Sequence, residues 1–286
     1  MLTFLPGPIR GALSLLLFTI NTLFWTVPLL LLHFLKLAVP MEGWRRFWSR
    51  LQNGIGVAWI SFNNWNLRLT NPVRWDIQGV DGLVGDRWYL VIANHQTWVD
   101  ILVLQRVFNG KIPFLKFFLK KELFWVPLLG LAWWALDYPF LERSALANKD
   151  LEAIQEAAKK FKTLPVSVMN FVEGTRFTPE NQENQRSPYT HLLKPKAGGM
   201  TFLLHSMSEE IHSVLDVTIA YPQGTPTMWG FMCGQAGEVF VRVKVIPVDE
   251  ELKGDFGKDK AFRRRFITWQ KDLWAEKDKT LEELLG

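Results

Sequence analysis

A histidine and an aspartate, His95 and Asp100, lie five positions apart directly after the apolar run Trp88–Ala93. On a continuous helix five residues turn the chain through about 500°, which leaves the two side chains roughly 140° apart. His95 is therefore expected in a turn, and if Thr97 caps a helix with Asp100 in its first turn, the carboxylate can reach the imidazole. Such a histidine can take a proton from an attacking alcohol, because the carboxylate fixes its tautomer and stabilises the imidazolium. The competing interpretation is an ordinary loop histidine and an ordinary helix acid.

A second group able to do chemistry is Arg176, which follows Glu173-Gly174-Thr175 at the end of the predicted strand Val166–Val172. Glycine lets a ligand approach the backbone closely, and a guanidinium can hold a phosphate through two parallel hydrogen bonds. The alternative is that Arg176 pairs with Glu173 as part of the scaffold, because isolated charge pairs are often structural.

Four blocks of the sequence carry a family pattern. They are Asn94–Asp100, Tyr138–Arg143, Phe171–Arg176, and Lys194–Gly199 with Val217–Pro222. In their order and separations, from about Pro72 to Pro247, the chain resembles the glycerolipid acyltransferases of the lysophosphatidic acid (1-acylglycerol-3-phosphate) acyltransferase type. The first block agrees with the family's Asn-His-(four residues)-Asp pattern. In the others Val172 replaces the usual proline, Glu142 replaces the usual aspartate before Arg143, and the customary glycine upstream of Arg143 is not evident.

The resemblance implies a membrane-bound acyltransferase. It would move a fatty acyl group from acyl-CoA or acyl carrier protein to the free hydroxyl of lysophosphatidic acid, giving phosphatidic acid. His95 would be the general base and Asp100 its orienting partner, and the thioester would be a co-substrate, so no cofactor is expected. The implied substrate-binding residues, with the phosphate held by the arginines, are Glu173, Gly174, Thr175, Arg176, Arg143 and Lys121. Gly174 would also let backbone N–H groups approach the developing oxyanion.

Two other functions stay open at this point. The acceptor of the acyl group could be a different lysophospholipid or lysolipid that lacks glycerol phosphate. The protein could instead be a non-catalytic membrane tether that binds RNA or another protein. Lys121 also has a second interpretation, a headgroup-facing lysine on an interfacial helix.

Composition narrows the class of partner. The chain has 286 residues, 48% of them hydrophobic, with 14 Trp and 21 Phe. This excess of aromatic residues suggests a membrane-associated protein, since tryptophan favours the boundary between water and lipid. The formal charge of +5 fits lipid headgroups, acyl carrier protein or nucleic acid. With the resemblance, we expect anionic membrane lipids and no nucleic acid. No metal site is expected, because His205 and His212 would lie two helical turns apart.

The N-terminal region predicts a membrane anchor. No residue between Arg10 and Lys36 is charged, and Gly11–Leu32 would form a helix about 33 Å long, enough to cross a bilayer. A signal peptide is the competing interpretation, but the run is too long and no cleavage site follows it. The basic residues after the anchor place the downstream chain in the cytoplasm. We expect the inner membrane of a bacterium, with the catalytic domain on the cytoplasmic side.

Two further segments have mixed character. Leu51–Leu67 is uncharged but contains five asparagine or glutamine residues, so it is expected to lie in the interface or to pair with the first helix. Ile112–Leu136 combines lysines with phenylalanines and tryptophans, which is typical of a segment lying on an anionic bilayer. The alternative for the second segment is a buried core helix pair broken at Pro127 and Gly130.

The remaining patterns predict an α/β fold with a mostly parallel central sheet flanked by helices, and an N-terminal membrane-embedded helical segment. The expected strands are Val73–Val80, Trp88–Ala93, Val166–Val172, Val214–Tyr221 and Glu238–Ile246, and the expected helices are Ala145–Phe161 and Lys196–Met207, with a loop at Asn181–Thr190. We divide the chain into an anchor (1–70), an acyltransferase domain (71–250) and a C-terminal amphipathic charged helix (251–286). The last would dock on the core or lie on the bilayer.

Overall fold

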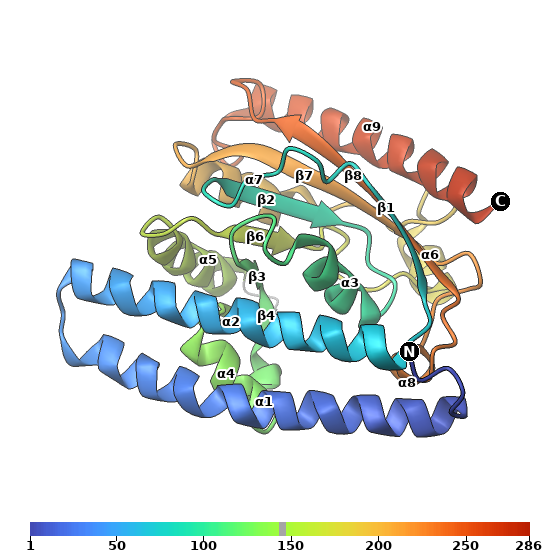
Figure 1. Cartoon of the computed structure of the whole chain (residues 1–286). Coiled ribbons are helices and arrows are strands. Elements are labelled where there is room, and N and C mark those ends of the chain that lie inside the picture. Colours follow the sequence, from blue (N-terminus) through green and yellow to red (C-terminus); the bar gives the residue numbers. More distant parts are fainter. Residues whose placement is uncertain (143–146) are drawn as a thin grey trace.

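The computed structural model describes residues 1–142 and 147–286, so the predicted site residue Arg143 lies outside it. Its centre is a sheet with the strand order β1-β8-β7-β2-β6-β3 (Figure 1). The strands are β1 (Arg74–Gln78), β2 (Trp88–Ala93), β3 (Leu115–Phe117), β6 (Ser167–Asn170), β7 (Ile211–Ala220) and β8 (Glu238–Pro247). Neighbouring strands run parallel except β7 and β8, which are antiparallel. The prediction of a mostly parallel sheet is confirmed.

Strand β2 is buried on both faces, which explains its unbroken apolar sequence. Val91 and Ala93 pack into one half of the core, and Leu90 and Ile92 into the other, because side chains alternate along a strand. The first half is covered by α1 (Gly7–Ala38), α2 (Glu42–Thr70), α3 (Val99–Phe108) and α4 (Leu129–Ala135), and the second by α5 (Ala147–Phe161), α7 (Ala197–Ser206) and α9 (Lys260–Leu285). The sheet therefore has helices on both faces.

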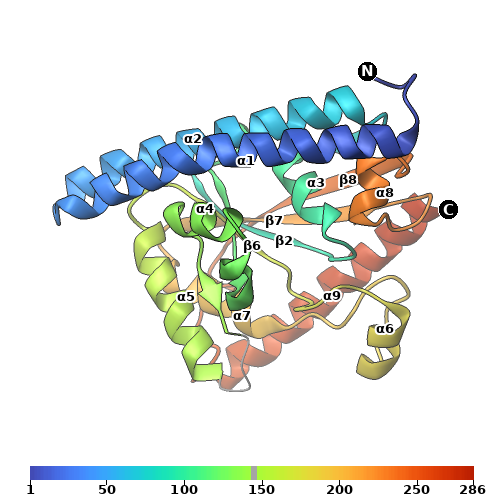
Figure 2. The ribbon, with the colours of Figure 1, turned by 90° about the horizontal axis from the view of Figure 1, so that it is seen from below.

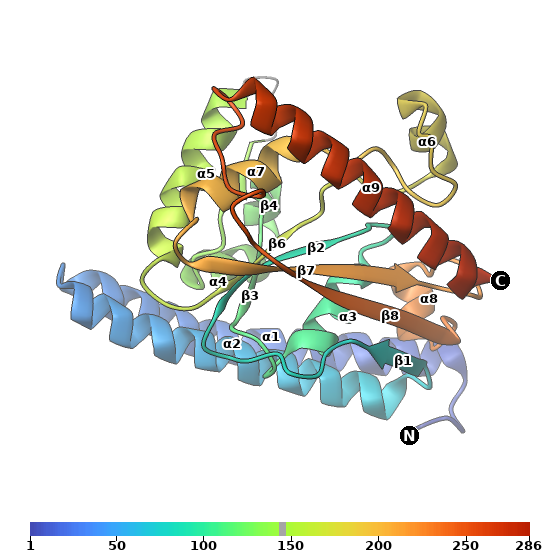
Figure 3. The same cartoon turned by 90° about the horizontal axis from the view of Figure 1, so that it is seen from above.

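The C-terminal helix α9 docks on the core rather than lying free (Figure 3). Its apolar stripe is fully or almost fully buried at Phe262, Phe266, Leu273 and Trp274. Lys277 is buried too, with Nζ 2.7 Å from Asp216 Oδ1 and 2.6 Å from the carbonyl oxygen of Val217. Of the two positions left open for this helix, the core is the one observed.

The N-terminal region forms two long helices, α1 (Gly7–Ala38) and α2 (Glu42–Thr70), that run side by side along the α/β domain (Figure 2). Polar side chains link them: Asn21 Nδ2 donates to Asn63 Oδ1 at 2.8 Å, and Asn66 Nδ2 donates to the carbonyl oxygen of Ser14 at 2.9 Å. Pairing with the first helix thus gives hydrogen-bond partners to two of the five amides, Asn63 and Asn66, that made Leu51–Leu67 unsuitable for lipid.

The segment Ile112–Leu136 differs from both of its interpretations. It comprises β3, the short strand β4 (Leu119–Lys120) that pairs with β5 (Phe140–Leu141), the 3-10 helix η1 (Lys121–Trp125) and α4 (Leu129–Ala135). Phe117 is buried, and Lys116 is buried with Nζ donating to the carbonyl oxygen of Leu136 at 2.8 Å. The first part therefore lies in the sheet and not on a bilayer. For the later part, η1 and α4, a position on the bilayer remains a prediction, since Trp125 there is 80% exposed.

Among the described residues, short α-helices also form in two places where none was expected. The expected loop Asn181–Thr190 begins inside α6 (Pro179–Gln185), which starts where the Thr178 hydroxyl oxygen accepts a hydrogen bond from the Asn181 N–H. The other is α8 (Met228–Met232), which packs against the start of α1. Helix α6 could not be predicted from the sequence pattern, because its residues are all polar apart from Pro179 and so show no hydrophobic periodicity.

Candidate active site

The turn after β2 is held in place by the side chain of Asn94. Its Nδ2 donates to the carbonyl oxygen of Ile219, and its Oδ1 accepts from the N–H of the same residue, both at 2.9 Å. The amide thus continues the β2–β7 ladder by one step after the backbone has left it. His95 is the first residue beyond this point.

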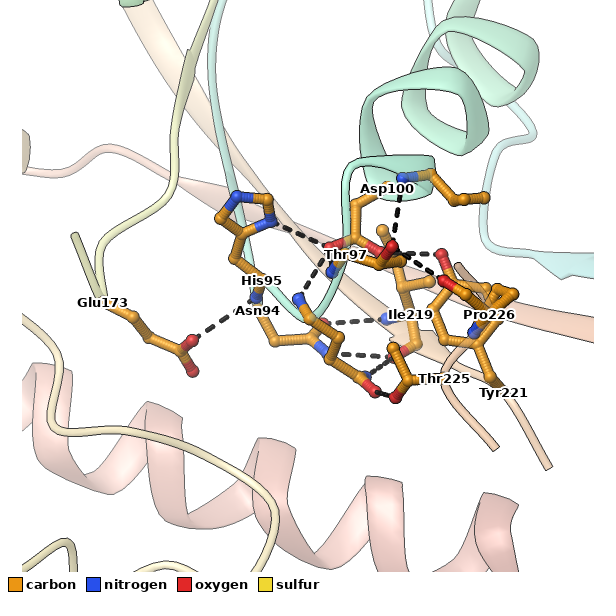
Figure 4. A network of polar contacts seen from close by, with 11 residues as sticks. Asn94, His95, Thr97, Asp100, Glu173, Ile219, Tyr221, Thr225 and Pro226 are labelled. Atoms are coloured by element: carbon orange, nitrogen blue, oxygen red, sulfur yellow. Dashed lines mark hydrogen bonds and ion pairs between the residues drawn. The ribbon is translucent and has the colours of Figure 1, made fainter. Parts of the chain in front are cut away.

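The carboxylate of Asp100 accepts hydrogen bonds from several groups of the turn that carries His95 (Figure 4). Its Oδ2 accepts from His95 Nδ1 at 2.8 Å and from the backbone N–H groups of Gln96 and Thr97 at 2.6 and 2.9 Å. Its Oδ1 accepts from the Tyr221 hydroxyl at 2.6 Å. The contact between His95 and Asp100 has the geometry expected from their spacing. Because the carboxylate accepts at Oδ2, a neutral His95 carries its proton on Nδ1 and presents the lone pair of Nε2.

The start of helix α3 differs in one detail from the prediction. Trp98, rather than Thr97, occupies the N-cap position, and no side chain caps the helix. The Thr97 hydroxyl donates instead to the carbonyl oxygen of Pro226 at 2.8 Å. Asp100 takes over the role of a cap, since it satisfies two N–H groups that precede the helix.

The imidazole of His95 is fixed by packing as well as by hydrogen bonding. Its ring stacks on Phe171 with 3.9 Å between centroids and 16° between planes. The side chain is 15% exposed, so the ring is largely enclosed but still reachable. Asp100, at 0% exposure, is out of reach of any substrate. Of the two side chains, only that of His95 is therefore accessible from outside.

The turn after β6 lies against the first turn. The N–H of Phe177 donates to the carbonyl oxygen of His95 at 2.6 Å. Glu173, also at 0% exposure, accepts from the N–H of His95 at 3.4 Å and from that of Leu193 at 3.3 Å. Burial raises the pKa of Glu173 to about 8, although these N–H groups, the nearby indole of Trp274 and the charge of Lys277 act in the opposite direction.

The structure contradicts the idea that Arg176 and Glu173 form a pair. Glu173 points inward, whereas Arg176 is exposed and its guanidinium lies 5.3 Å from the ring centroid of Trp98. Trp98 belongs to the His95 turn and is itself 44% exposed. Arg176 is therefore an open cation directly beside the turn that carries His95.

Gly174 permits the close approach of another cation, Lys196. Its φ of +73° is a conformation that glycine adopts freely, and a Cβ there would lie 3.0 Å from Lys196 Nζ. Lys196 is exposed, and its N–H donates to the carbonyl oxygen of Val172 at 2.7 Å. The N–H of Gly174 itself is engaged by the carbonyl oxygen of Phe171 at 3.0 Å. Thr175, next in the chain, is half-buried.

The sequence analysis did not assign roles to Tyr221 and Lys196, although both lie in blocks that it identified. The signal for Tyr221 was its position at the end of β7, next to β2 in a sheet whose parallel strands end at one edge. The signal for Lys196 was a basic residue at the start of a helix. Neither signal states which side chain reaches Asp100 or Gly174.

Lys121 has its own partner. It begins η1 and donates to Glu142 Oε1 at 2.6 Å, a contact that raises the pKa of Lys121. Among the residues described, none of its hydrogen bonds or ion pairs reaches the His95 turn. Among all the residues that the structure describes, no three His, Cys, Asp or Glu side chains are grouped so that they could hold a metal ion.

The sequence model of the Acyltransferase family matches residues 74–222, just over half of the chain. The site therefore lies in a domain of known type, since this range contains both turns and Tyr221. The chain belongs to the Acyltransferase family.

Individual relatives agree with this assignment. The chain is 29% identical over 218 residues to 1-acyl-sn-glycerol-3-phosphate acyltransferase 3 of Arabidopsis thaliana, with 70% of this chain and 54% of the relative covered. It is 26% identical over 208 residues to 1-acyl-sn-glycerol-3-phosphate acyltransferase delta of Bos taurus, with 68% and 52% covered. The chain thus spans about half the length of these curated relatives.

A solved structure has the same fold. The 1-acyl-sn-glycerophosphate (LPA) acyltransferase PlsC of Thermotoga maritima superposes with a TM-score of 0.50 and 20% identity, and the comparison covers 96% of this chain and 97% of that one. The likeness includes the N-terminal helices, because almost the whole chain is covered.

Proposed function

We propose that this protein is an acyltransferase that moves a fatty acyl group from a thioester to the free hydroxyl of a lysophospholipid. The observation that carries the proposal is the contact of 2.8 Å between His95 Nδ1 and the buried Asp100, which leaves Nε2 as the acceptor of a proton. The family and the names of the relatives support the same reaction.

In this mechanism His95 Nε2 accepts the proton of the acceptor's hydroxyl while the hydroxyl oxygen attacks the thioester carbonyl. The tetrahedral intermediate then collapses, the C–S bond breaks, and the thiolate leaves and takes a proton from the imidazolium. Asp100 stabilises that imidazolium and holds its tautomer. A thioester needs little activation, so the protein contributes mainly positioning and proton transfer.

We propose lysophosphatidic acid as the acceptor, with phosphatidic acid as the product. Two exposed cations support this choice, Arg176 beside Trp98 and Lys196 beside Gly174, because both flank the glycine turn next to His95. A phosphate monoester carries enough negative charge to pair with both cations, and a guanidinium can hold it through two hydrogen bonds. Arg143 and Lys121 remain predicted phosphate contacts that rest on the family resemblance alone. The donor is acyl-CoA or acyl carrier protein.

We also propose that the protein is attached to a membrane through α1. Among the described residues, α1 is the one helix long and apolar enough to cross a bilayer. Its outer side is strongly exposed at apolar residues along its whole length, including Leu16, Phe24, Leu31 and Phe34. Because α8 packs near its start and α4 farther along, α1 lies along the domain (Figure 2), which favours a helix in the plane of one leaflet. The cytoplasmic face of a bacterial inner membrane stays a prediction from charge and resemblance.

An acceptor and donor panel tests the proposal. Protein purified in detergent is given acyl-CoA or acyl carrier protein thioester with either lysophosphatidic acid or a lysolipid that lacks phosphate. We expect transfer to lysophosphatidic acid to be more efficient by tenfold or more, on the order of one charge-assisted contact. A preference for the phosphate-free lipid would make this an acyltransferase for another lysolipid. No transfer with any combination would favour a non-catalytic tether.

A further inference from the structure

A cavity lies at the opposite end of the sheet from His95. It has a volume of about 680 Å³ and is formed by the end of α1, the start of α2, the chain after α4 and the second half of α5. The tip of the helical pair, where α1 ends and α2 begins, lies at the same end of the molecule as α5 in Figure 1, whereas β2 points toward the other end. No residue of the turns that carry His95 and Glu173 lines this cavity, although it shares Tyr138, Pro139 and Phe140 with the second block of the family pattern.

The cavity has an excess of positive charge. Five cations and three carboxylates line it, a difference of two. Each carboxylate is already paired: Asp137 with Lys36, Glu42 with Arg46, and Glu156 with Lys160. The two cations left over are Arg45 and Lys159, which have no carboxylate within 4 Å among the described residues. An anion of one or two charges would balance them.

The floor of the cavity is ordered by buried polar contacts. Asp137 has a φ of +57°, a conformation that costs a non-glycine residue about 1 kcal/mol or more, and its ion pair with Lys36 holds it there. Lys36 is only 8% exposed, and the neighbouring His33 is 4% exposed with Nδ1 3.2 Å from the carbonyl oxygen of Ala135. The charged floor is thus a built feature and not a chance gap between surface side chains.

One wall of the cavity is apolar and continues onto the surface of α1. Leu37 and Trp134 line it and are 50% and 37% exposed. Phe34, on the adjoining turn of α1, is 61% exposed, and its ring lies 6.5 Å from that of Trp134 in an edge-to-face arrangement. A ligand with an anionic head and apolar chains would meet cations inside and an apolar surface outside.

We propose that this cavity binds the phosphate headgroup of an anionic membrane glycerophospholipid, as a second lipid site apart from the acyl-transfer site. Arg45 and Lys159 contact the phosphate, and the acyl chains lie along Trp134, Leu37 and the exposed face of α1. The basic residues thereby hold the tip of the helical pair at the level of the headgroups.

Lipid binding to the full chain in detergent tests this site. The probe is dihexanoyl phosphatidate, measured by titration calorimetry and native mass spectrometry in an Arg176→Ala/Lys196→Ala background, which removes both exposed cations proposed to hold the acceptor's phosphate near His95. The test variant is Arg45→Gln/Lys159→Gln. The matched control is Arg264→Gln/Lys279→Gln, which removes the same charge from exposed positions on α9. Glycerol 3-phosphate serves as a headgroup without chains.

We expect one phosphatidate to bind in the background and control proteins, and its affinity to fall about tenfold or more in the test variant. Glycerol 3-phosphate should bind at least tenfold more weakly than phosphatidate, since it cannot use the apolar wall. Equal affinity in test and control variants would overturn the proposal. So would equal binding of glycerol 3-phosphate and phosphatidate.

Discussion

Two buried carboxyl groups flank His95, and their surroundings differ. Asp100 follows β2 and accepts four hydrogen bonds of 2.6 to 2.9 Å, one of them from the imidazole. Glu173 follows β6 and accepts two longer ones, of 3.3 and 3.4 Å, both from backbone N–H groups. Asp100 therefore orients the imidazole of His95, while Glu173 joins the backbone of one turn to that of another.

The comparison shows how the same chemical group serves two purposes. Strong donors surround Asp100 on both oxygens, so its position defines that of the His95 ring. Glu173 has few donors and a pKa raised to about 8 by burial, so near neutral pH it is mostly a neutral carboxylic acid. Substitutions at the two positions should therefore have very different consequences.

Among substitutions of the groups around His95, the largest effect should come from Asp100→Asn. The amide no longer matches the donors around it and favours the wrong tautomer of His95, so turnover should fall by roughly 10⁴, as in hydrolytic triads. Glu173→Gln, which preserves shape and neutrality, should lose less than about tenfold at pH 7. Initial rates of acyl transfer for the two proteins measure the difference. Equal losses would remove the distinction between the two carboxyl groups.

Arg176→Lys should have the next largest effect. The charge stays but the planar fork is lost, so efficiency with lysophosphatidic acid should fall by about tenfold to a hundredfold. The apparent affinity for the thioester should change little. Arg264→Lys, at an exposed position on α9, is the matched control. An equal loss with a phosphate-free lysolipid would show that Arg176 supports the turn through Trp98 and does not bind phosphate.

Tyr221→Phe should have a smaller effect. It removes one hydrogen bond to Asp100 Oδ1 but leaves the three on Oδ2, so kcat should fall by about fivefold to tenfold, equivalent to roughly 1 to 1.4 kcal/mol. KM should stay unchanged. A loss as large as that of Asp100→Asn would mean that the tyrosine, and not the carboxylate alone, sets the position of His95.

Glu173→Gln should have the smallest effect on turnover, but it should clearly change how the free energy of unfolding depends on pH. The folded-state pKa of Glu173, about 8, lies above its ordinary value of 4.5, so the folded protein binds the proton more tightly. The resulting stability is complete below about pH 4.5 and is lost as the pH rises toward 8. It amounts to about 3 to 5 kcal/mol. Urea unfolding at pH 5 and pH 8 should show a steeper decline in the wild type than in Glu173→Gln, and parallel curves would contradict the assignment.

The two turns also differ in how far the sequence could predict them. The contact between His95 and Asp100 joins residues only five positions apart, so spacing and the geometry of helices predicted it. Glu173 depends on Leu193 and Trp274, which are distant in the sequence, and nothing local distinguishes a buried glutamate from one that pairs with Arg176. Lys116 shows the same limit. Its charge suggested a surface, but its aliphatic stem and the carbonyl oxygen of Leu136 allow it to be buried.

A cycle of His95→Ala, Asp100→Asn and the double variant tests the central claim, that Asp100 acts through His95. Each protein is checked for its fold and assayed for transfer to lysophosphatidic acid. We predict that His95→Ala leaves only a residual rate, about 10⁴ or more below the wild type, and that the double variant is no slower than His95→Ala, because residues that act as a unit are not additive. Near wild-type activity in His95→Ala, or losses that multiply in the double variant, would contradict the account.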